Sequence, residues 1–163
     1  MAIIKAILSD KDYQLIKQYV SRETFHMKQT EKKGRRNIIG GYGESIAAKY
    51  LQQRGLEIVD TNYLKKWGEI DIVARETGVI RFIEVKTVSY ETKQDLKLSI
   101  SRETWKPEDN VHRAKINRLN RAIESWIQEN QYKGDWEIDV IAVRIVTREK
   151  YATLKYIRNV ILD

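Results

Sequence analysis

Two neighbouring runs of β-branched and aromatic residues constrain the fold of this chain more than any other stretch. The runs are residues 70–74 and 79–85, and a few polar residues and one glycine separate them. Runs of this kind around a short break that contains glycine are typical of a β-hairpin. We therefore predict an antiparallel hairpin in which Arg75 pairs with Ile80 and residues 76–79 form the loop.

The predicted register of this hairpin places two acidic side chains directly opposite each other. Side chains alternate between the two faces of a strand, so the predicted register sets Asp71 opposite Glu84 and Glu69 opposite Lys86. Like charges about 5 Å apart repel by about 3 kcal/mol at an effective dielectric constant of about 20. Protonation of one carboxylate, or a cation between the two, relieves this repulsion. The hairpin therefore indicates a site for a divalent metal ion.

The composition limits the chemistry of such a site. The chain has 163 residues, which suits one domain with a hydrophobic core. It has no cysteine and two histidines, so the ligands must be mainly oxygen atoms, which favours Mg²⁺ or Mn²⁺ over Zn²⁺. The net charge of +7 favours a polyanionic partner without choosing between DNA, RNA and a membrane surface. Since no apolar run approaches membrane-spanning length and cysteine is absent, we expect a cytoplasmic protein with no membrane partner.

The first 36 residues are expected to form an extension that precedes the main domain, which covers residues 37–163. Residues 1–27 hold a short apolar run and a narrow helical stripe. They form either an extra helix packed on the domain, which we favour, or an arm for oligomerisation or a partner. Residues 28–36 are predicted to form a polar linker. Its cations either contact nucleic-acid phosphates or remain solvated, and they are Lys32, Lys33, Arg35 and Arg36.

Two amphipathic helices are predicted in the main domain. The first runs from near Gly43 to Arg54 and carries Glu44 at the head of its apolar stripe. Glu44 either lies near a site on the sheet or only interacts favourably with the helix N-terminus. The second helix covers residues 111–129, and three of its basic residues are candidates for binding nucleic acid. They are Lys115, at the margin of the buried face, and Arg113 and Arg118, which lie off that face.

Further strands complete a mixed sheet. Residues 57–62 are predicted as a strand before the hairpin, and residues 136–146 and 152–157 as a second hairpin. Residues 87–109 are predicted as a long irregular loop. Within it, Trp105 either stacks on a base or covers the core. The order of these elements predicts an α/β or α+β fold in which helices flank a mixed sheet of about five strands.

Taken together and in order, these motifs resemble the YraN-type family of small endonuclease-like proteins in the PD-(D/E)XK nuclease superfamily. The matching blocks are GYGESIAAKYLQQRGLEIVDTNY, GEIDIVAR, IRFIEVKT, the helix that carries Lys115, and WEIDVIAV. The resemblance extends from Gly40 to Ile161. It implies an α/β fold with a restriction-endonuclease-like core, similar to that of archaeal Holliday-junction resolvases, which act as dimers.

The resemblance also implies roles for individual residues. The expected ligands of Mg²⁺ or Mn²⁺ are Glu44, Asp71, Glu84 and the carbonyl of Val85. Asp71 and Glu84 are expected to be catalytic together with Lys86. Glu69 is an accessory candidate, either as a further ligand or as an ion-pair partner of Lys86.

The sequence thus favours a metal-dependent endonuclease, a hydrolase that cleaves phosphodiester bonds in DNA. Branched or otherwise structured DNA is the suggested substrate, and a homodimer the suggested assembly. The metal would lower the pKa of bound water and screen the phosphodiester charge. Lys86 would position or deprotonate the attacking water, or stabilise the transition state. Two alternatives stay open: a nucleic-acid-binding module without catalysis, and a protein-interaction subunit whose charges form only surface ion pairs.

Overall fold

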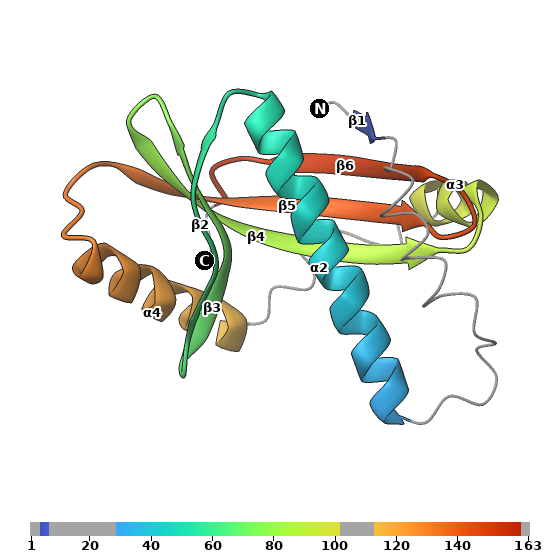
Figure 1. Ribbon diagram of the computed structural model, residues 1–163, viewed down its shortest axis with the longest axis horizontal. Coiled ribbons are helices and arrows are strands. Elements are labelled where there is room, and N and C mark those ends of the chain that lie inside the picture. The colour runs from blue at the N-terminus through green and yellow to red at the C-terminus, as the bar shows by residue number, and fades with distance from the viewer. Residues whose placement is uncertain (1–3, 7–28, 102–112, 161–163) are drawn as a thin grey trace.

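Six strands form one mixed sheet in the order β1-β6-β5-β4-β3-β2 (Figure 1). The computed structural model describes residues 4–6, 29–101 and 113–160, with side chains described for residues 37–101 and 115–160. The elements in chain order are β1 (Ile4–Ala6), α2 (Gln29–Gln53), β2 (Glu57–Lys65), β3 (Gly68–Glu76), β4 (Val79–Tyr90), α3 (Lys93–Ser101), α4 (Arg113–Glu129), β5 (Trp136–Val146) and β6 (Tyr151–Ile157).

The sheet is mixed because β4 and β5 run parallel, whereas every other pair of neighbouring strands is antiparallel. This confirms the predicted α/β fold with a mixed sheet and flanking helices. The short strand β1, which lies within the predicted N-terminal extension, adds a sixth strand by pairing with β6. The division of the chain at residue 36 stays a prediction. Within the described residues, no helix combines the length and the apolar character needed to cross a membrane.

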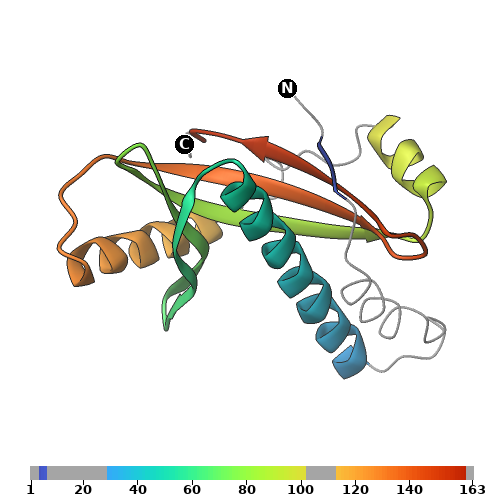
Figure 2. The same ribbon diagram turned by 45° about the horizontal axis from the view of Figure 1, so that its top comes forward.

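Two apolar layers hold the helices on the sheet. Helix α2 buries Ala47 and Leu51 against a cluster that includes Ile72 of β3. Helix α4 contributes Trp126 to a separate cluster around Phe82 of β4. Figure 2 shows α2 crossing the middle of the strands and α4 lying along the end where β5 begins. Because side chains of successive strand residues point to opposite faces, one strand can supply both clusters.

The hairpin of β3 and β4 has the predicted register. Arg75 pairs with Ile80, and the next pair, Glu76 with Val79, closes the turn. The loop is therefore two residues long rather than four. Its residues Thr77 and Gly78 have φ angles of 48° and 89°. Two positive φ values are what a type I′ turn requires, and this turn matches the natural twist of a hairpin.

The predicted linker over residues 28–36 is wrong, because α2 already begins at Gln29. The prediction that this helix begins near Gly43 is wrong for the same reason. Residues 29–36 contain no proline and are rich in Lys, Arg, Gln and Glu, all of which are good helix formers. Their charge suggested a solvated linker, and the glycines after them suggested a break. The predicted nucleic-acid contacts of the helical residues Lys32, Lys33, Arg35 and Arg36 concern side chains outside the described residues.

The predicted loop over residues 87–109 is also wrong for most of its length. Strand β4 continues to Tyr90 because it pairs with β5 from Ile80 to Tyr90. Helix α3 then begins with a reciprocal cap between Thr92 and Asp95. The amide of Asp95 donates to Oγ1 of Thr92 at 3.2 Å, and the amide of Thr92 donates to Oδ2 of Asp95 at 3.1 Å. The segment around Trp105 lies outside the described residues.

Gly43 sets the distance between α2 and the sheet. A Cβ atom at this position would lie 1.8 Å from Oγ1 and 2.8 Å from Cβ of Thr87 in β4. Rotation of the threonine side chain moves Oγ1 but not Cβ, so it does not relieve the contact. At Gly40, one helical turn earlier, a Cβ atom would meet nothing within 4 Å. The helix therefore needs glycine at Gly43 for packing and has no such need at Gly40.

We predict opposite effects for alanine at these two glycines. Gly43→Ala should lower the free energy of unfolding by about 1–3 kcal/mol, because the new methyl group forces α2 away from Thr87. Gly40→Ala should raise it by about 0.5–1 kcal/mol, because alanine favours an open helix position. Urea unfolding measures both. A Gly43→Ala protein as stable as Gly40→Ala would contradict this view of the helix contact.

Candidate metal centre

The site forms where β3 separates from β4. The last ladder pair of these strands is Ile72 with Ile83. The predicted direct pairs Asp71–Glu84 and Glu69–Lys86 are therefore not part of the ladder, although its register is right. Beyond the last pair, the backbone N–H of Val85 donates to Oδ2 of Asp71 at 2.7 Å. A side-chain carboxylate thus serves as the acceptor for a strand amide at this point.

Asp71 is buried, with 9% of its surface exposed. Burial raises the pKa of its carboxyl group to about 7, and the nearby negative charge of Glu84 adds to this effect. The hydrogen bond from the Val85 amide acts in the opposite direction without cancelling it. Asp71 therefore releases its proton near neutral pH, unless a cation binds beside it.

Glu84 lies between two ammonium groups. Its side chain is 5% exposed, and its Oε1 atom is 2.6 Å from Nζ of Lys86. Nζ of Lys115, which α4 brings to the sheet, contacts the same oxygen. The other oxygen, Oε2, is buried and has no hydrogen-bond partner among the described residues. A buried carboxylate oxygen without a partner is unfavourable, which marks this atom as a candidate ligand.

The two lysines have different environments. Burial lowers the pKa of Lys86, helped by the nearby ammonium of Lys115, although the Glu84 carboxylate acts in the opposite direction. Burial also disfavours the charge of Lys115, but Glu84 outweighs this effect and raises the pKa of Lys115. Lys115 therefore keeps its positive charge, and Lys86 loses its proton more readily than an ordinary lysine does.

Glu44 approaches the same region from α2. Its carboxylate and that of Asp71 line one cavity of about 380 Å³, together with Asn62 of β2. Burial raises the pKa of Glu44, and the negative charges of Glu69 and Glu84 add to the rise, while a hydrogen bond with Asn62 lowers it. Asp71 also interacts electrostatically with both Glu44 and Glu84. Glu44 and Glu84 are therefore both close enough to Asp71 to affect its charge.

The donor atoms suit a hard divalent cation. Carboxylate and carbonyl oxygens are the ligands of Mg²⁺ and Mn²⁺, and the partnerless Oε2 atom of Glu84 is one of them. Among the described residues, however, no group of three or more His, Cys, Asp or Glu side chains is close enough to hold a metal ion together. The ligand set Glu44, Asp71, Glu84 and Val85 stays a prediction that fits the site by its chemistry.

The other predicted site residues lie around this cluster. Glu69 is exposed on β3, and Arg118 is exposed on α4. Arg113 begins α4, and its side chain lies outside the described part of the chain. Of the basic residues predicted to bind nucleic acid, Lys115 is the one whose described contacts include a carboxylate of the candidate centre.

Sequence reasoning missed a third buried acidic residue, Asp139 of β5. Nη1 of Arg81 lies 3.0 Å from Oδ2 of Asp139, and the hydroxyl group of Tyr156 donates to the same oxygen at 2.5 Å. The backbone amide of Asn159 donates to Oδ1 at 2.8 Å. Both oxygens therefore have partners, and this network is structural. The signal was present, because the triplet EID ends at both Asp71 and Asp139, in strands with long apolar runs.

We predict that Asp71→Asn stabilises the metal-free protein at alkaline pH. A carboxyl group whose pKa is raised by folding keeps its proton in the folded state, so stability falls as pH rises from about 4 to about 7. The amide cannot ionise, so in EDTA at about pH 8 the variant should exceed the wild type by about 1–3 kcal/mol, and by much less at about pH 5.

Urea unfolding at the two pH values measures this difference. Asp139→Asn is the matched control, because its carboxylate is paired with Arg81, Tyr156 and Asn159. It should lower stability at both pH values. An Asp71→Asn protein that is no more stable than the wild type at the higher pH would show that Asp71 ionises without penalty.

Comparison with known proteins gives one consistent result. A family model described as "Uncharacterised protein family UPF0102" matches residues 43–143. A UPF0102 protein of Beutenbergia cavernae is 35% identical over 126 residues, which cover 77% of this chain and 97% of that protein. One of Desulfitobacterium hafniense is 33% identical over 129 residues, which cover 77% and 97%. One of Campylobacter fetus is 33% identical over 125 residues, which cover 76% and 93%. The residues matched by the family model include every member of the candidate centre.

Proposed function

The chain belongs to the uncharacterised protein family UPF0102, the YraN-type endonuclease-like group, and we propose that it is a metal-dependent nuclease that hydrolyses phosphodiester bonds in DNA. The observation that carries the proposal is the buried pair Asp71 and Glu84 beside two lysines, with one Glu84 oxygen lacking a described partner. Burial raises the pKa of Asp71 to about 7, and buried groups with strongly shifted pKa values are concentrated at functional sites.

The proposed ligands of Mg²⁺ or Mn²⁺ are Asp71, Glu84 and the carbonyl of Val85, together with Glu44, which lines the same cavity as Asp71. When bound, such an ion supplies Lewis-acid stabilisation of a phosphodiester and a more acidic water molecule. Asp71 supports this role, because an ion beside it would favour the charged carboxylate that burial disfavours.

Lys86 is the proposed catalytic base or electrostatic group. Its ammonium lies 2.6 Å from Glu84 and has a lowered pKa, so it can exchange a proton with an attacking water more readily than a solvated lysine. In its charged form it would stabilise the negative charge that develops on the phosphate. Lys115 is the proposed partner that holds Glu84 in place and keeps a positive charge beside the substrate.

The proposal extends to the substrate and the assembly. The net charge of +7 favours a polyanionic partner, and nucleic acid is the partner we propose. Branched or structured DNA is proposed because the resemblance to the YraN-type family implies a fold similar to that of archaeal Holliday-junction resolvases, and a homodimer is proposed for the same reason. A cytoplasmic location is proposed because the chain contains no cysteine.

A second candidate is a nucleic-acid-binding module without catalysis. It is favoured by the contacts of Glu84, whose Oε1 atom meets the ammonium groups of both Lys86 and Lys115. The protein itself thereby compensates this charge, so the fold has no need of a metal ion there. Such a module would bind DNA equally well with and without divalent metal, with an affinity that falls as salt rises.

We predict that the folded protein cleaves labelled DNA in the presence of Mn²⁺ and that Glu84→Gln and Lys86→Ala each reduce the rate at least about 100-fold. Branched, single-stranded and duplex substrates are compared by gel electrophoresis. Glu124→Gln and Lys97→Ala are matched controls, because both residues are exposed and lie outside the site, and their rates should stay unchanged.

Two results would reject the proposed nuclease function. One is an absence of cleavage by wild-type protein that binds DNA, which would support the second candidate. The other is cleavage that survives both substitutions at Glu84 and Lys86, which would assign the activity to another site or to a contaminant.

A further inference from the structure

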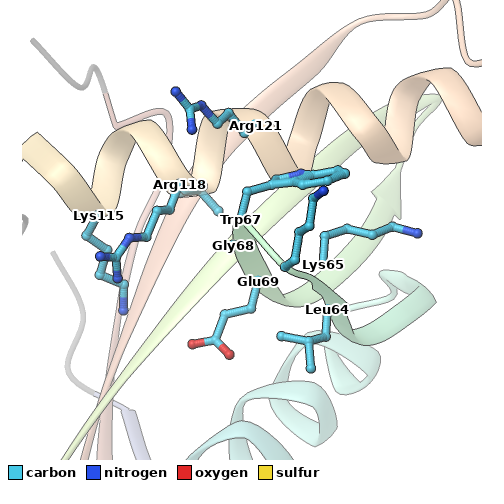
Figure 3. A pocket seen from close by; sticks show the side chains of 10 residues that line it. Leu64, Lys65, Trp67, Gly68, Glu69, Lys115, Arg118 and Arg121 are labelled. Atoms are coloured by element: carbon cyan, nitrogen blue, oxygen red, sulfur yellow. The ribbon is translucent and has the colours of Figure 1, made fainter.

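A basic groove of about 810 Å³ lies beside the candidate centre, between helix α4 and the turn that joins β2 to β3 (Figure 3). The side chains that define it come from both walls. They are Lys65, Lys66 and Trp67 from the end of β2 and the turn, and Lys115, Arg118 and Arg121 from α4. Glu69 is the acidic residue among the groove-lining residues.

The positive charge of the groove is only partly compensated within the protein. Nζ of Lys65 lies 2.7 Å from Glu129, and Lys115 contacts Glu84. The ion pairs of the described residues include none for Lys66, Arg118 or Arg121. Three cations on two facing walls attract an anionic chain that runs between them.

Trp67 gives the groove an aromatic surface with a fixed position. Its indole N–H donates to Oγ of Ser125 on α4 at 3.1 Å, and Nζ of Lys66 lies 5.3 Å from the ring centroid. The next residue, Gly68, brings the turn against α4. A Cβ atom there would lie 2.2 Å from the carbonyl oxygen of Arg118. A rigid indole beside cations is a typical stacking surface for nucleic-acid bases.

The size of the groove favours a single strand over a duplex. Pockets of roughly 300–1,000 Å³ hold one drug-sized ligand, which is the scale of a few nucleotides at most. A duplex keeps its bases stacked inside, where Trp67 could not reach a base face without unpairing it. An acidic peptide would match the cations but would leave the indole surface without a planar partner. Unpaired nucleotides match both features.

The groove is continuous with the candidate centre through Lys115. This residue lines the groove, and its Nζ atom contacts Glu84. We propose that the groove binds a single strand of nucleic acid, with a base stacked on Trp67 and phosphates on Lys66, Arg118 and Arg121. Delivery of this strand to the centre rests on the proposed nuclease function, whereas binding in the groove does not.

The test measures binding without cleavage. Fluorescence anisotropy in EDTA gives the affinity of the full chain for short labelled oligo-dT, oligo-rU and duplex DNA. Trp67→Ala should weaken single-strand binding about 5- to 100-fold, and Trp67→Phe should retain most of it. Replacing Arg118 and Arg121 together by alanine should weaken binding and reduce the slope of log K against log salt by about 1.4.

Matched controls lie outside the groove. Trp136→Ala removes an indole that is 44% exposed, and Lys97→Ala removes an exposed cation. Both should bind within about twofold of the wild type, which is the ordinary effect of a surface substitution. The proposal is overturned if Trp67→Ala binds like Trp136→Ala. It is also overturned if duplex binding falls as much as single-strand binding, or if poly-glutamate displaces the strand as well as unlabelled oligo-dT does.

Cleavage assays with Mn²⁺ separate this proposal from the nuclease. If Trp67→Ala loses single-strand binding while the wild type cleaves no DNA, strand binding in the groove is supported and the nuclease function is rejected. If the wild type cleaves DNA and Trp67→Ala binds and cleaves it as well as the wild type does, the nuclease function is supported and strand binding in the groove is rejected.

Discussion

The hydrogen bond from the Val85 amide to the Asp71 carboxylate is the contact on which the rest of the site depends. It gives a strand amide its acceptor at the point where β3 leaves β4, and it holds an acidic group inside the protein. Burial of that group raises its pKa to about 7, and the second buried carboxylate, Glu84, adds to the rise. Two negative charges in this position are unfavourable without cations nearby. Lys86 and Lys115 both contact one oxygen of Glu84, and the other oxygen has no partner among the described residues.

The two helices complete the site from opposite faces of the sheet. Helix α2 brings Glu44 to the cavity beside Asp71, and it approaches this closely because Gly43 places no side chain against Thr87. Helix α4 brings Lys115 to Glu84 and also forms one wall of the basic groove. The same helix therefore links the charge balance of the centre to the surface where we expect substrate. By contrast, the Arg81–Asp139 network has partners for both carboxylate oxygens and needs nothing further.

The sequence was sufficient where the decisive contacts are local in the chain. The register of the hairpin was predicted from two apolar runs around a polar break, although its loop is shorter than predicted, and helix α4 was predicted from its apolar stripe. Asp71, Glu84 and Lys86 could be grouped because they lie on that one hairpin. The part of α2 before Gly43 was missed because its charged first turns resemble a linker, and only contact with the sheet shows that Gly43 is a packing residue. The partners of Asp139 and the groove at Trp67 depend on elements that are distant in the chain, so no local sequence pattern predicts them.

The central claim is that Asp71 and Glu84 form a binding site for a divalent cation. Calorimetric titration of Mn²⁺ into the metal-free protein tests it without relying on a substrate. We expect one saturable site in the wild type and in Glu124→Gln, and an affinity at least about tenfold lower in Asp71→Asn and in Glu84→Gln, since loss of even an outer-shell partner costs a metal site about that much. Absence of binding by the wild type, or equal binding by the two site variants, would contradict the claim.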